Sequence, residues 1–209
     1  MSLVLRKLKV ELGSTTLFTI NAEVAPGAIL TVMGASGSGK STLLNAIAGF
    51  LEPSFSMSGQ IVLDGTDLTH VPPQKRRVGL MFQDALLFPH MSVGENLAFA
   101  LAHEPQFTRT ERMAKVAAAL RDIGLTGYET RDPATLSGGQ QSRVALMRTL
   151  LAEPALILMD EPFSRLDTAL REEIRNHTFA RVRAANIPAI LVTHDHADAE
   201  AAGGAVVTI

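Results

Sequence analysis

A glycine-rich octapeptide at 34–41, Gly-Ala-Ser-Gly-Ser-Gly-Lys-Ser, restricts the fold of this chain more than any other feature. It follows an apolar run at 28–33 and precedes a helical pattern at 42–48. Its spacing fits G-x-x-x-x-G-K-[ST], in which the glycines let successive backbone N–H groups curl around a phosphate. The helix that follows directs its positive end at the same anion. The octapeptide therefore predicts a strand, a phosphate-binding loop and a helix, with a plain glycine-rich turn as the alternative.

Nine residues are expected to contact the phosphates of a nucleotide through backbone or side chain. Lys40 is expected to reach the β- and γ-phosphates, and the Ser41 hydroxyl is expected to hold Mg²⁺. The full set is Gly34, Ala35, Ser36, Gly37, Ser38, Gly39, Lys40, Ser41 and Thr42.

Short apolar runs recur along the chain and indicate the fold class. Such runs are typical of strands buried on both faces of a parallel sheet, and helical patterns separate several of them. A capping box, Thr108-x-x-Glu111, begins one helix, and a second helix is predicted over 168–184. The apolar runs lie at 28–33, 78–82, 155–159, 189–192 and 205–209. The helix that begins at Thr108 is expected to present one apolar face, made of Met113, Val116, Ala117, Leu120 and Ile123.

The alternation of strands and helices predicts the α/β class. Residues 84–153 lack a buried-strand run, so they are interpreted as a helical insertion between two parts of a sheet core, 1–83 and 154–209. The first thirty residues and 59–64 are expected to add shorter strands in a small antiparallel sheet. The prediction is therefore a single domain with one inserted helical subdomain.

A pair of acidic residues, Asp160-Glu161, ends the predicted strand at 155–159. Ligands of open α/β sheets gather at the carboxyl ends of the strands. Asp160 is placed to hold Mg²⁺ through water, and Glu161 is placed to act as a base toward an attacking water. Two solvated acids at a strand end are the alternative, which the phosphate-binding loop disfavours.

A third motif, Leu-Ser-Gly-Gly-Gln at 136–140, precedes a helical pattern. Ser137 suits a helix N-cap, and a capped helix after a loop would explain this motif taken alone. It would not explain the order of the motifs along the chain. Gln83 follows the apolar run at 78–82, Ser-Arg-Leu-Asp occupies 164–167, and Thr-His-Asp occupies 193–195. In this order the motifs resemble those of the ATP-binding cassette (ABC) family over essentially the whole chain.

The resemblance implies a P-loop NTPase (RecA-like) core and an ATPase with ATP and Mg²⁺ as ligands. It implies charge stabilisation by Lys40, a base role for Glu161 and a γ-phosphate contact for His194. It assigns Gln83 to Mg²⁺ and the attacking water. It also implies that a second copy contributes a nucleotide contact made of Ser137, Gly138, Gly139, Gln140 and Asp167.

The resemblance further indicates a subtype and its partners. The segments 73–77 and 83–96 are similar to those of binding-protein-dependent importers of the thiamine, polyamine, sulfate and ferric-iron type. The partners implied are a second cassette, identical or paralogous, a membrane permease contacted through 83–91, and indirectly an extracytoplasmic solute-binding protein. The apolar cluster Leu86-Leu87-Phe88-Pro89 either folds into the core or contacts the permease, and the resemblance favours contact, with Leu87 and Phe88 as the residues whose replacement is expected to uncouple transport. The expected location is peripheral, on the cytoplasmic face of the plasma membrane.

Three departures from the family pattern bear on function. The family's adenine-stacking aromatic is replaced by Leu12, with Phe18 as the nearest candidate, so weak discrimination between ATP and GTP is expected. Arg165 stands where the D-loop usually has a small residue. The sequence ends at Ile209, so no carboxy-terminal regulatory domain is expected.

Composition excludes several other classes. The net charge of −2 gives no electrostatic reason to expect nucleic acid, and the chain has no cysteine. No apolar run approaches the roughly 20 residues needed to span a bilayer.

A metal site at His194, Asp195, His196 and Asp198 is disfavoured against a switch histidine with solvated neighbours. An ABC ATPase of assembly or repair and a non-hydrolysing regulatory subunit remain as rival functions.

Overall fold

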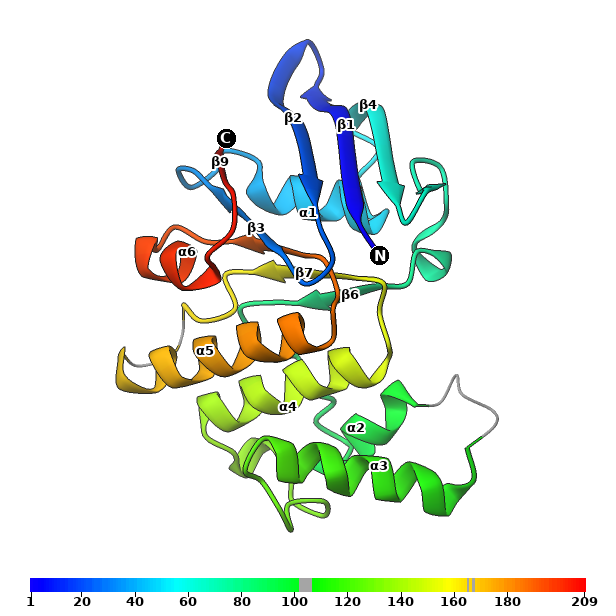
Figure 1. Ribbon diagram of the computed structural model, residues 1–209, viewed down its shortest axis with the longest axis vertical. Coiled ribbons are helices and arrows are strands. Elements are labelled where there is room, and N and C mark those ends of the chain that lie inside the picture. The colour runs from blue at the N-terminus through cyan, green and yellow to red at the C-terminus, as the bar shows by residue number, and fades with distance from the viewer. Residues whose placement is uncertain (102–106, 165, 167) are drawn as a thin grey trace. The chain divides into compact units, whose positions relative to one another are not determined.

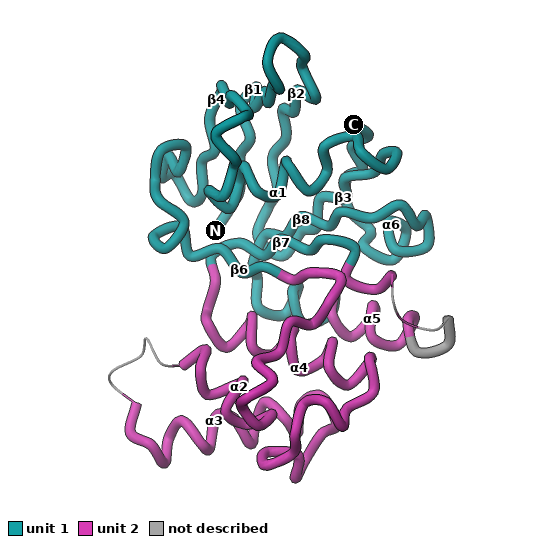
Figure 2. The backbone as a smooth tube through the Cα atoms, turned by 180° about the vertical axis from the view of Figure 1, so that it is seen from behind, with its two compact units in different colours: residues 1–80, 155–161, 179–209 teal, residues 81–154, 162–178 magenta. Residues whose placement is uncertain are grey.

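The computed structural model describes residues 1–101, 107–164, 166 and 168–209, and side chains in all of these except 168–170. Contacts divide the chain into two compact units (Figure 2). Unit 1 comprises Met1–Leu80, Ala155–Glu161 and Phe179–Ile209, and unit 2 comprises Met81–Pro154 and Pro162–Thr178. Arg165 and Asp167 of the D-loop motif lie outside the described residues.

The amino-terminal part of unit 1 is an antiparallel sheet with the order β2-β1-β4-β5. The sequence predicted shorter strands here, but β1 and β2 have ten residues each. Side chains of β1 alternate between buried and accessible until a register shift between Leu5 and Leu8, where Lys7 adopts a φ of 45°. This irregularity puts Leu3, Leu5 and Leu8 on one buried face. The strands are β1 (Leu3–Leu12), β2 (Thr15–Val24), β4 (Phe55–Leu63) and β5 (Thr66–Asp67).

The second sheet of unit 1 has five strands in the order β6-β7-β8-β3-β9, with β3 parallel to both β8 and β9 and β7 parallel to β8. The prediction of strands buried on both faces is confirmed for the three central ones, β3, β7 and β8. It is wrong for β6 and β9, which lie at the edges and stay partly accessible. The strands are β3 (Ile29–Met33), β6 (Val78–Met81), β7 (Leu156–Asp160), β8 (Ala189–Val192) and β9 (Val206–Thr208).

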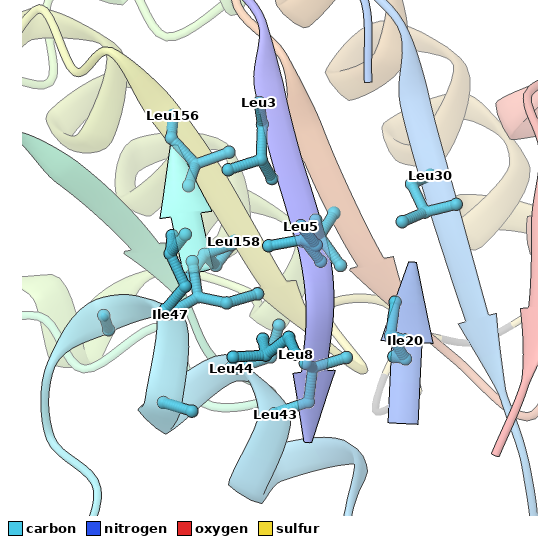
Figure 3. Close-up of a cluster of buried hydrophobic side chains, with 14 of the residues drawn as sticks. Leu3, Leu5, Leu8, Ile20, Leu30, Leu43, Leu44, Ile47, Leu156 and Leu158 are labelled. Carbon is cyan, nitrogen blue, oxygen red and sulfur yellow. The ribbon is translucent and has the colours of Figure 1, made fainter. Parts of the chain in front are cut away.

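Helix α1 (Lys40–Ala48) lies between the two sheets of unit 1 (Figure 1). Its apolar side chains join those of both sheets in one core, drawn in Figure 3. The core therefore fixes the start of α1 at the carboxyl end of β3. The labelled core residues are Leu3, Leu5, Leu8, Ile20, Leu30, Leu43, Leu44, Ile47, Leu156 and Leu158.

Arg76 holds the carboxyl end of α1. Its buried guanidinium donates to the carbonyls of Ala46 and Ile47 at 3.0 and 2.8 Å, and to the connecting segment at Val71 O (2.6 Å) and Thr69 O (3.3 Å). The last carbonyls of a helix lack intrahelical partners and favour a positive charge. Arg76 supplies hydrogen-bond donors as well as a positive charge. It thereby anchors α1, a helix of only nine residues, at the end opposite the phosphate-binding loop.

Unit 2 contains three helices that each begin with a capping box, and their apolar faces share one core. The predicted N-caps at Thr108 and Ser137 are confirmed. The predicted apolar face of α3 is partly wrong, because Met113 is exposed and Ala119 is buried instead. The helices are α2 (Val93–Ala100), α3 (Arg109–Asp122) and α4 (Gly138–Leu151).

Two further helices complete the chain. Helix α5 (Thr168–Ala184) begins in unit 2 and ends in unit 1, and α6 (His196–Ala202) belongs to unit 1. Short 3-10 turns occur at Pro73–Lys75 and Pro133–Thr135. Among the described residues, no helix combines the length and the apolar character needed to cross a bilayer.

Candidate nucleotide site

The glycine-rich loop connects β3 to α1, as predicted from its flanks. Gly37 and Gly39 have φ angles of 82° and 97°, which residues other than glycine rarely adopt. A side chain on Gly39 would also meet the ring of Phe18, 3.1 Å from the position its Cβ would take. The loop therefore depends on glycine both for its backbone turn and for its close packing on β2.

Lys40, the first residue of α1, is only 8% exposed. Its ammonium donates to the carbonyls of Gly34 and Ala35 at 2.9 and 2.7 Å within the loop. A buried ammonium is costly unless an opposite charge accompanies it. The buried Ser38 hydroxyl oxygen, in the same loop, has no hydrogen-bond partner. A buried cation, an unsatisfied hydroxyl and a helix N-terminus together fit a phosphate group.

Two oxygen-bearing side chains meet where β7 ends. Asp160, the last residue of β7, accepts a hydrogen bond from the Ser41 side chain of α1. Burial raises the pKa of the Asp160 carboxyl above its usual range, and the charge of Glu161 adds to the rise. The Ser41 hydrogen bond and the charge of Lys40 act in the opposite direction. A hydroxyl beside a carboxylate is a pair of hard oxygen ligands, which fits Mg²⁺.

Glu161 and His194 come together from neighbouring parallel strands. Glu161 follows β7 with a φ of 45°, and its N–H donates to Val192 O at the end of β8 at 2.9 Å. This places Glu161 Oε1 3.1 Å from Nδ1 of His194. A non-glycine residue with positive φ is uncommon and is concentrated at functional sites. The strained backbone thus turns the Glu161 carboxylate toward the histidine.

These side chains line one cavity of about 400 Å³, within the size range of small-molecule sites. Loop, helix start and carboxylates meet at its polar end, and apolar side chains of the antiparallel sheet form the other end. The lining residues are Leu12, Leu17, Ser36, Gly37, Gly39, Lys40, Ser41, Thr42, Phe55, Asp160, Glu161 and His194.

Sequence reasoning missed two residues of this cavity, Leu17 and Phe55, and named Phe18 as the nearest aromatic. Phe18 is buried in the core and packs beneath Gly39, whereas the adjacent Leu17 lines the cavity. The alternation of β2 offered a signal for Leu17. No sequence signal pointed to Phe55, because this residue reaches the cavity only through the pairing of β4 with β1.

The alternative metal site after β8 gains no support, since the described part of the chain contains no group of three or more His, Asp or Glu arranged to hold a metal ion. The prediction that all neighbours of His194 are solvated is wrong for Asp198. Its carboxylate is buried and accepts a hydrogen bond from the Thr193 hydroxyl at 3.0 Å, while Asp195 caps α6. These contacts fix the turn that presents His194.

The remaining predicted site residues belong to unit 2. Gln83 is exposed in the loop after β6. Ser137 caps α4: its hydroxyl accepts from the Gln140 N–H at 3.3 Å, and the Gln140 Oε1 accepts from the Ser137 N–H at 3.0 Å. Gly138 and Gly139 form the first turn of α4. The functions of these residues stay predictions.

The loop 82–92 of unit 2 is held by two polar side chains. Arg148 of α4 donates to Leu86 O at 2.9 Å and to Ala85 O at 3.3 Å, and its guanidinium lies over the ring of Phe88. Asn96, fully buried, accepts from the Phe88 N–H at 2.8 Å and donates to Phe88 O at 3.1 Å. Leu87 packs against the helical core, whereas Leu86 is 56% exposed with a φ of 45°.

A parallel sheet with a phosphate-binding loop, a strand-end carboxylate pair and a nucleotide-sized cavity defines a P-loop nucleotide-binding protein. A profile of the ABC transporter family matches residues 17–164. The chain therefore belongs to the ABC transporter family, whose ATP-binding proteins are ATPases.

Relatives are similar over most of the chain. It is 47% identical over 188 residues to the "uncharacterized ABC transporter ATP-binding protein YnjD" of Escherichia coli (strain K12), covering 90% of this chain and 86% of the relative. It is 43% identical over 196 residues to the thiamine import ATP-binding protein ThiQ of Jannaschia sp. (strain CCS1), covering 94% and 83%. It is 40% identical over 206 residues to the Fe(3+) ions import ATP-binding protein FbpC of Escherichia coli O157:H7, covering 98% of this chain but 58% of that relative.

Proposed function

We propose that this chain is the ATP-hydrolysing subunit of an ABC importer, acting on the cytoplasmic face of a membrane permease. The observation that carries the proposal is the single cavity in which Lys40 and Ser41 lie with Asp160, Glu161 and His194. Thiamine and Fe(3+) import relatives support the direction of transport. An extracytoplasmic binding protein would deliver the solute to the permease.

The polar end of the cavity suits the triphosphate of ATP. Lys40 and the N–H groups at the start of α1 stabilise the phosphate charge. Ser41, Asp160 and Gln83 would hold Mg²⁺, which supplies neutralisation of charge on the phosphate oxygens when it is bound. Phosphoryl transfer needs mainly positioning and charge stabilisation, so a rigid loop and a buried cation are suited to it.

Glu161 is the base of the proposed reaction. Water attacks the γ-phosphorus while its proton passes to the Glu161 carboxylate; the bond between the γ-phosphorus and the β–γ bridging oxygen breaks, releasing ADP and phosphate. His194 orients Glu161 through the 3.1 Å contact and, with an exposed ring, turns to the γ-phosphate when nucleotide binds. Gln83 positions the water.

A second copy, or a paralogous cassette, completes the site in this proposal. Helix α4 begins with two glycines whose N–H groups suit an anion, and Ser137 and Gln140 cap this turn. Asp167, in the D-loop motif at 164–167, would add a further contact of the second copy with the nucleotide. Closure of the two cassettes on ATP and their opening after hydrolysis would be a ligand-driven shift between two states.

Leu86 is the proposed apolar contact for the permease within the segment 83–91. It is an exposed leucine in left-handed backbone, a strained conformation, and Arg148 fixes its carbonyl. Leu86 belongs to the apolar cluster 86–89 that the sequence indicated, in which Leu87 packs on the helical core and Phe88 packs on Phe99 and Arg148. In this proposal Leu87 and Phe88 support the loop from inside, and the exposed Leu86 side chain contacts the permease.

A Leu86→Ser variant is therefore expected to lower permease-stimulated ATPase at least about fivefold while leaving the basal ATPase of the isolated subunit unchanged. Met113→Ser, which alters an equally large exposed side chain of unit 2, serves as the matched control. The measurement is phosphate release with and without a permease that is shown by pull-down to bind the wild-type chain. Equal stimulation of both variants would remove Leu86 from the contact.

The proposed function as a whole is tested by phosphate release from the purified chain given ATP. Hydrolysis should require Mg²⁺ and should rise on adding a permease that binds the chain, reconstituted in vesicles together with the solute-binding protein of that permease. A protein that binds ATP without any hydrolysis under these conditions would contradict the proposal and favour a regulatory subunit.

A further inference from the structure

The apolar end of the cavity is built by three strands of the antiparallel sheet. Leu12 ends β1, Leu17 lies near the start of β2, and Phe55 begins β4. Leu12 is 46% exposed, while Leu17 and Phe55 are half-buried and rest on the core of unit 1. Among the described residues that line the cavity, Phe55 and His194 alone carry aromatic rings, and His194 lies with the carboxylates.

The register of the sheet explains why these side chains meet. Leu12 of β1 pairs directly with Phe55 of β4, and directly opposed residues project to the same face. A turn in which the Phe55 N–H donates to Glu52 O at 3.0 Å leads into β4 at this point. Successive residues of a strand project to opposite faces, so Leu17 lines the cavity and Phe18 enters the core.

We propose that Phe55 is the residue on which the base of the nucleotide stacks, a role that rests on the proposed ATPase function. It takes the place of the aromatic that is absent at Leu12. The ring is supported from below by the core and has its position fixed by strand pairing, so little conformational entropy is lost when a base packs on it. Leu12 and Leu17 exclude water from the rim of the stacked base.

Stacking on Phe55 supplies affinity for a base without choosing between purines. All three side chains at this end of the cavity are apolar and offer no hydrogen-bonding group to the base edge. Stacking tolerates every base because every base has a π-face. The site therefore distinguishes a nucleotide from a bare triphosphate and binds ATP and GTP with affinities within about tenfold of each other.

The test compares three probes, Mg-ATP, Mg-GTP and Mg-tripolyphosphate, by calorimetric titration of wild type and variants. Phe55→Ala should weaken ATP and GTP by about 5- to 150-fold and leave tripolyphosphate within about twofold of wild type. Phe55→Tyr should retain nucleotide affinity because it keeps the ring. Phe50→Ala, which removes an exposed phenylalanine outside the cavity lining, should change none of the three.

Tripolyphosphate binding reports whether Phe55→Ala is folded. If that variant fails to fold, Phe55→Leu replaces it, since leucine keeps an apolar side chain on the core but has no ring, and it should weaken ATP at least about fivefold and leave tripolyphosphate unchanged. An ATP affinity that stays at the wild-type value when the ring at position 55 is removed overturns the proposal while the ATPase function stands. A wild type that binds neither ATP nor tripolyphosphate overturns the proposed function itself, and the role of Phe55 with it.

Discussion

A Glu161→Gln variant is expected to lose at least about a hundredfold in ATP turnover while binding ATP as tightly as wild type. The amide keeps the shape of the side chain but cannot take the proton of the attacking water, and a positioned base contributes about 10²- to 10⁴-fold. ATP bound without hydrolysis should hold two copies together. Phosphate release, ATP titration and light scattering in ATP measure the three effects.

The control for this variant is Glu172→Gln, which makes the same chemical change at an exposed position of α5. It should hydrolyse ATP at the wild-type rate and leave the oligomeric state in ATP unchanged. If Glu161→Gln also keeps the wild-type rate, the base is another group and the contact with His194 has a structural purpose. If turnover falls with ATP affinity in parallel, Glu161 contributes to binding instead.

A Lys40→Ala variant is expected to bind ATP about a hundredfold more weakly. A charged donor contributes about 1.5–3 kcal/mol per hydrogen bond, and each 1.4 kcal/mol is tenfold in affinity. The nucleotide-free variant should be at least as stable as wild type, because alanine removes a buried ammonium whose partners are carbonyl oxygens. Thermal unfolding should therefore show an unchanged or raised Tm without ATP and little further rise on adding ATP.

Lys75→Ala removes an exposed lysine and is the matched control, since it should keep the full ATP-induced rise in Tm. This pattern separates a binding function from a structural one. A structural lysine would lower the Tm of the nucleotide-free protein when replaced. A Lys40→Ala protein that keeps wild-type ATP affinity would contradict the phosphate-binding assignment.

The parts of the site that sequence predicted are those encoded by short segments. The loop at 34–41, the pair Asp160-Glu161 and the N-cap Ser137 each depend on neighbours within a few residues, so their spacing carries the structure. The order of the central sheet brings the ends of β7 and β8 together, and with them Glu161 and His194. Predicted strands at its edges proved less buried than their apolar sequence suggested.

Sequence could not predict features that depend on long-range pairing. Phe55 reaches the cavity through its register with a residue 43 positions earlier in the chain, and a shift of one residue would turn it away. In the loop 82–92, three adjacent apolar residues look equivalent in sequence. The bonds from Arg148 and Asn96 decide that Leu86 is exposed while Leu87 is packed.

The guanidinium of Arg76 makes the rigidity of the phosphate-binding helix insensitive to acidity. Burial lowers the pKa of Arg76, but an arginine guanidinium is the most basic of the ordinary side chains, so its charge persists at any physiological pH. A histidine at this position would lose its charge near neutrality and release the carbonyls of the last turn. The far end of α1 is therefore held by a side chain that keeps its charge, and its bonds to the helix, when the surrounding pH changes.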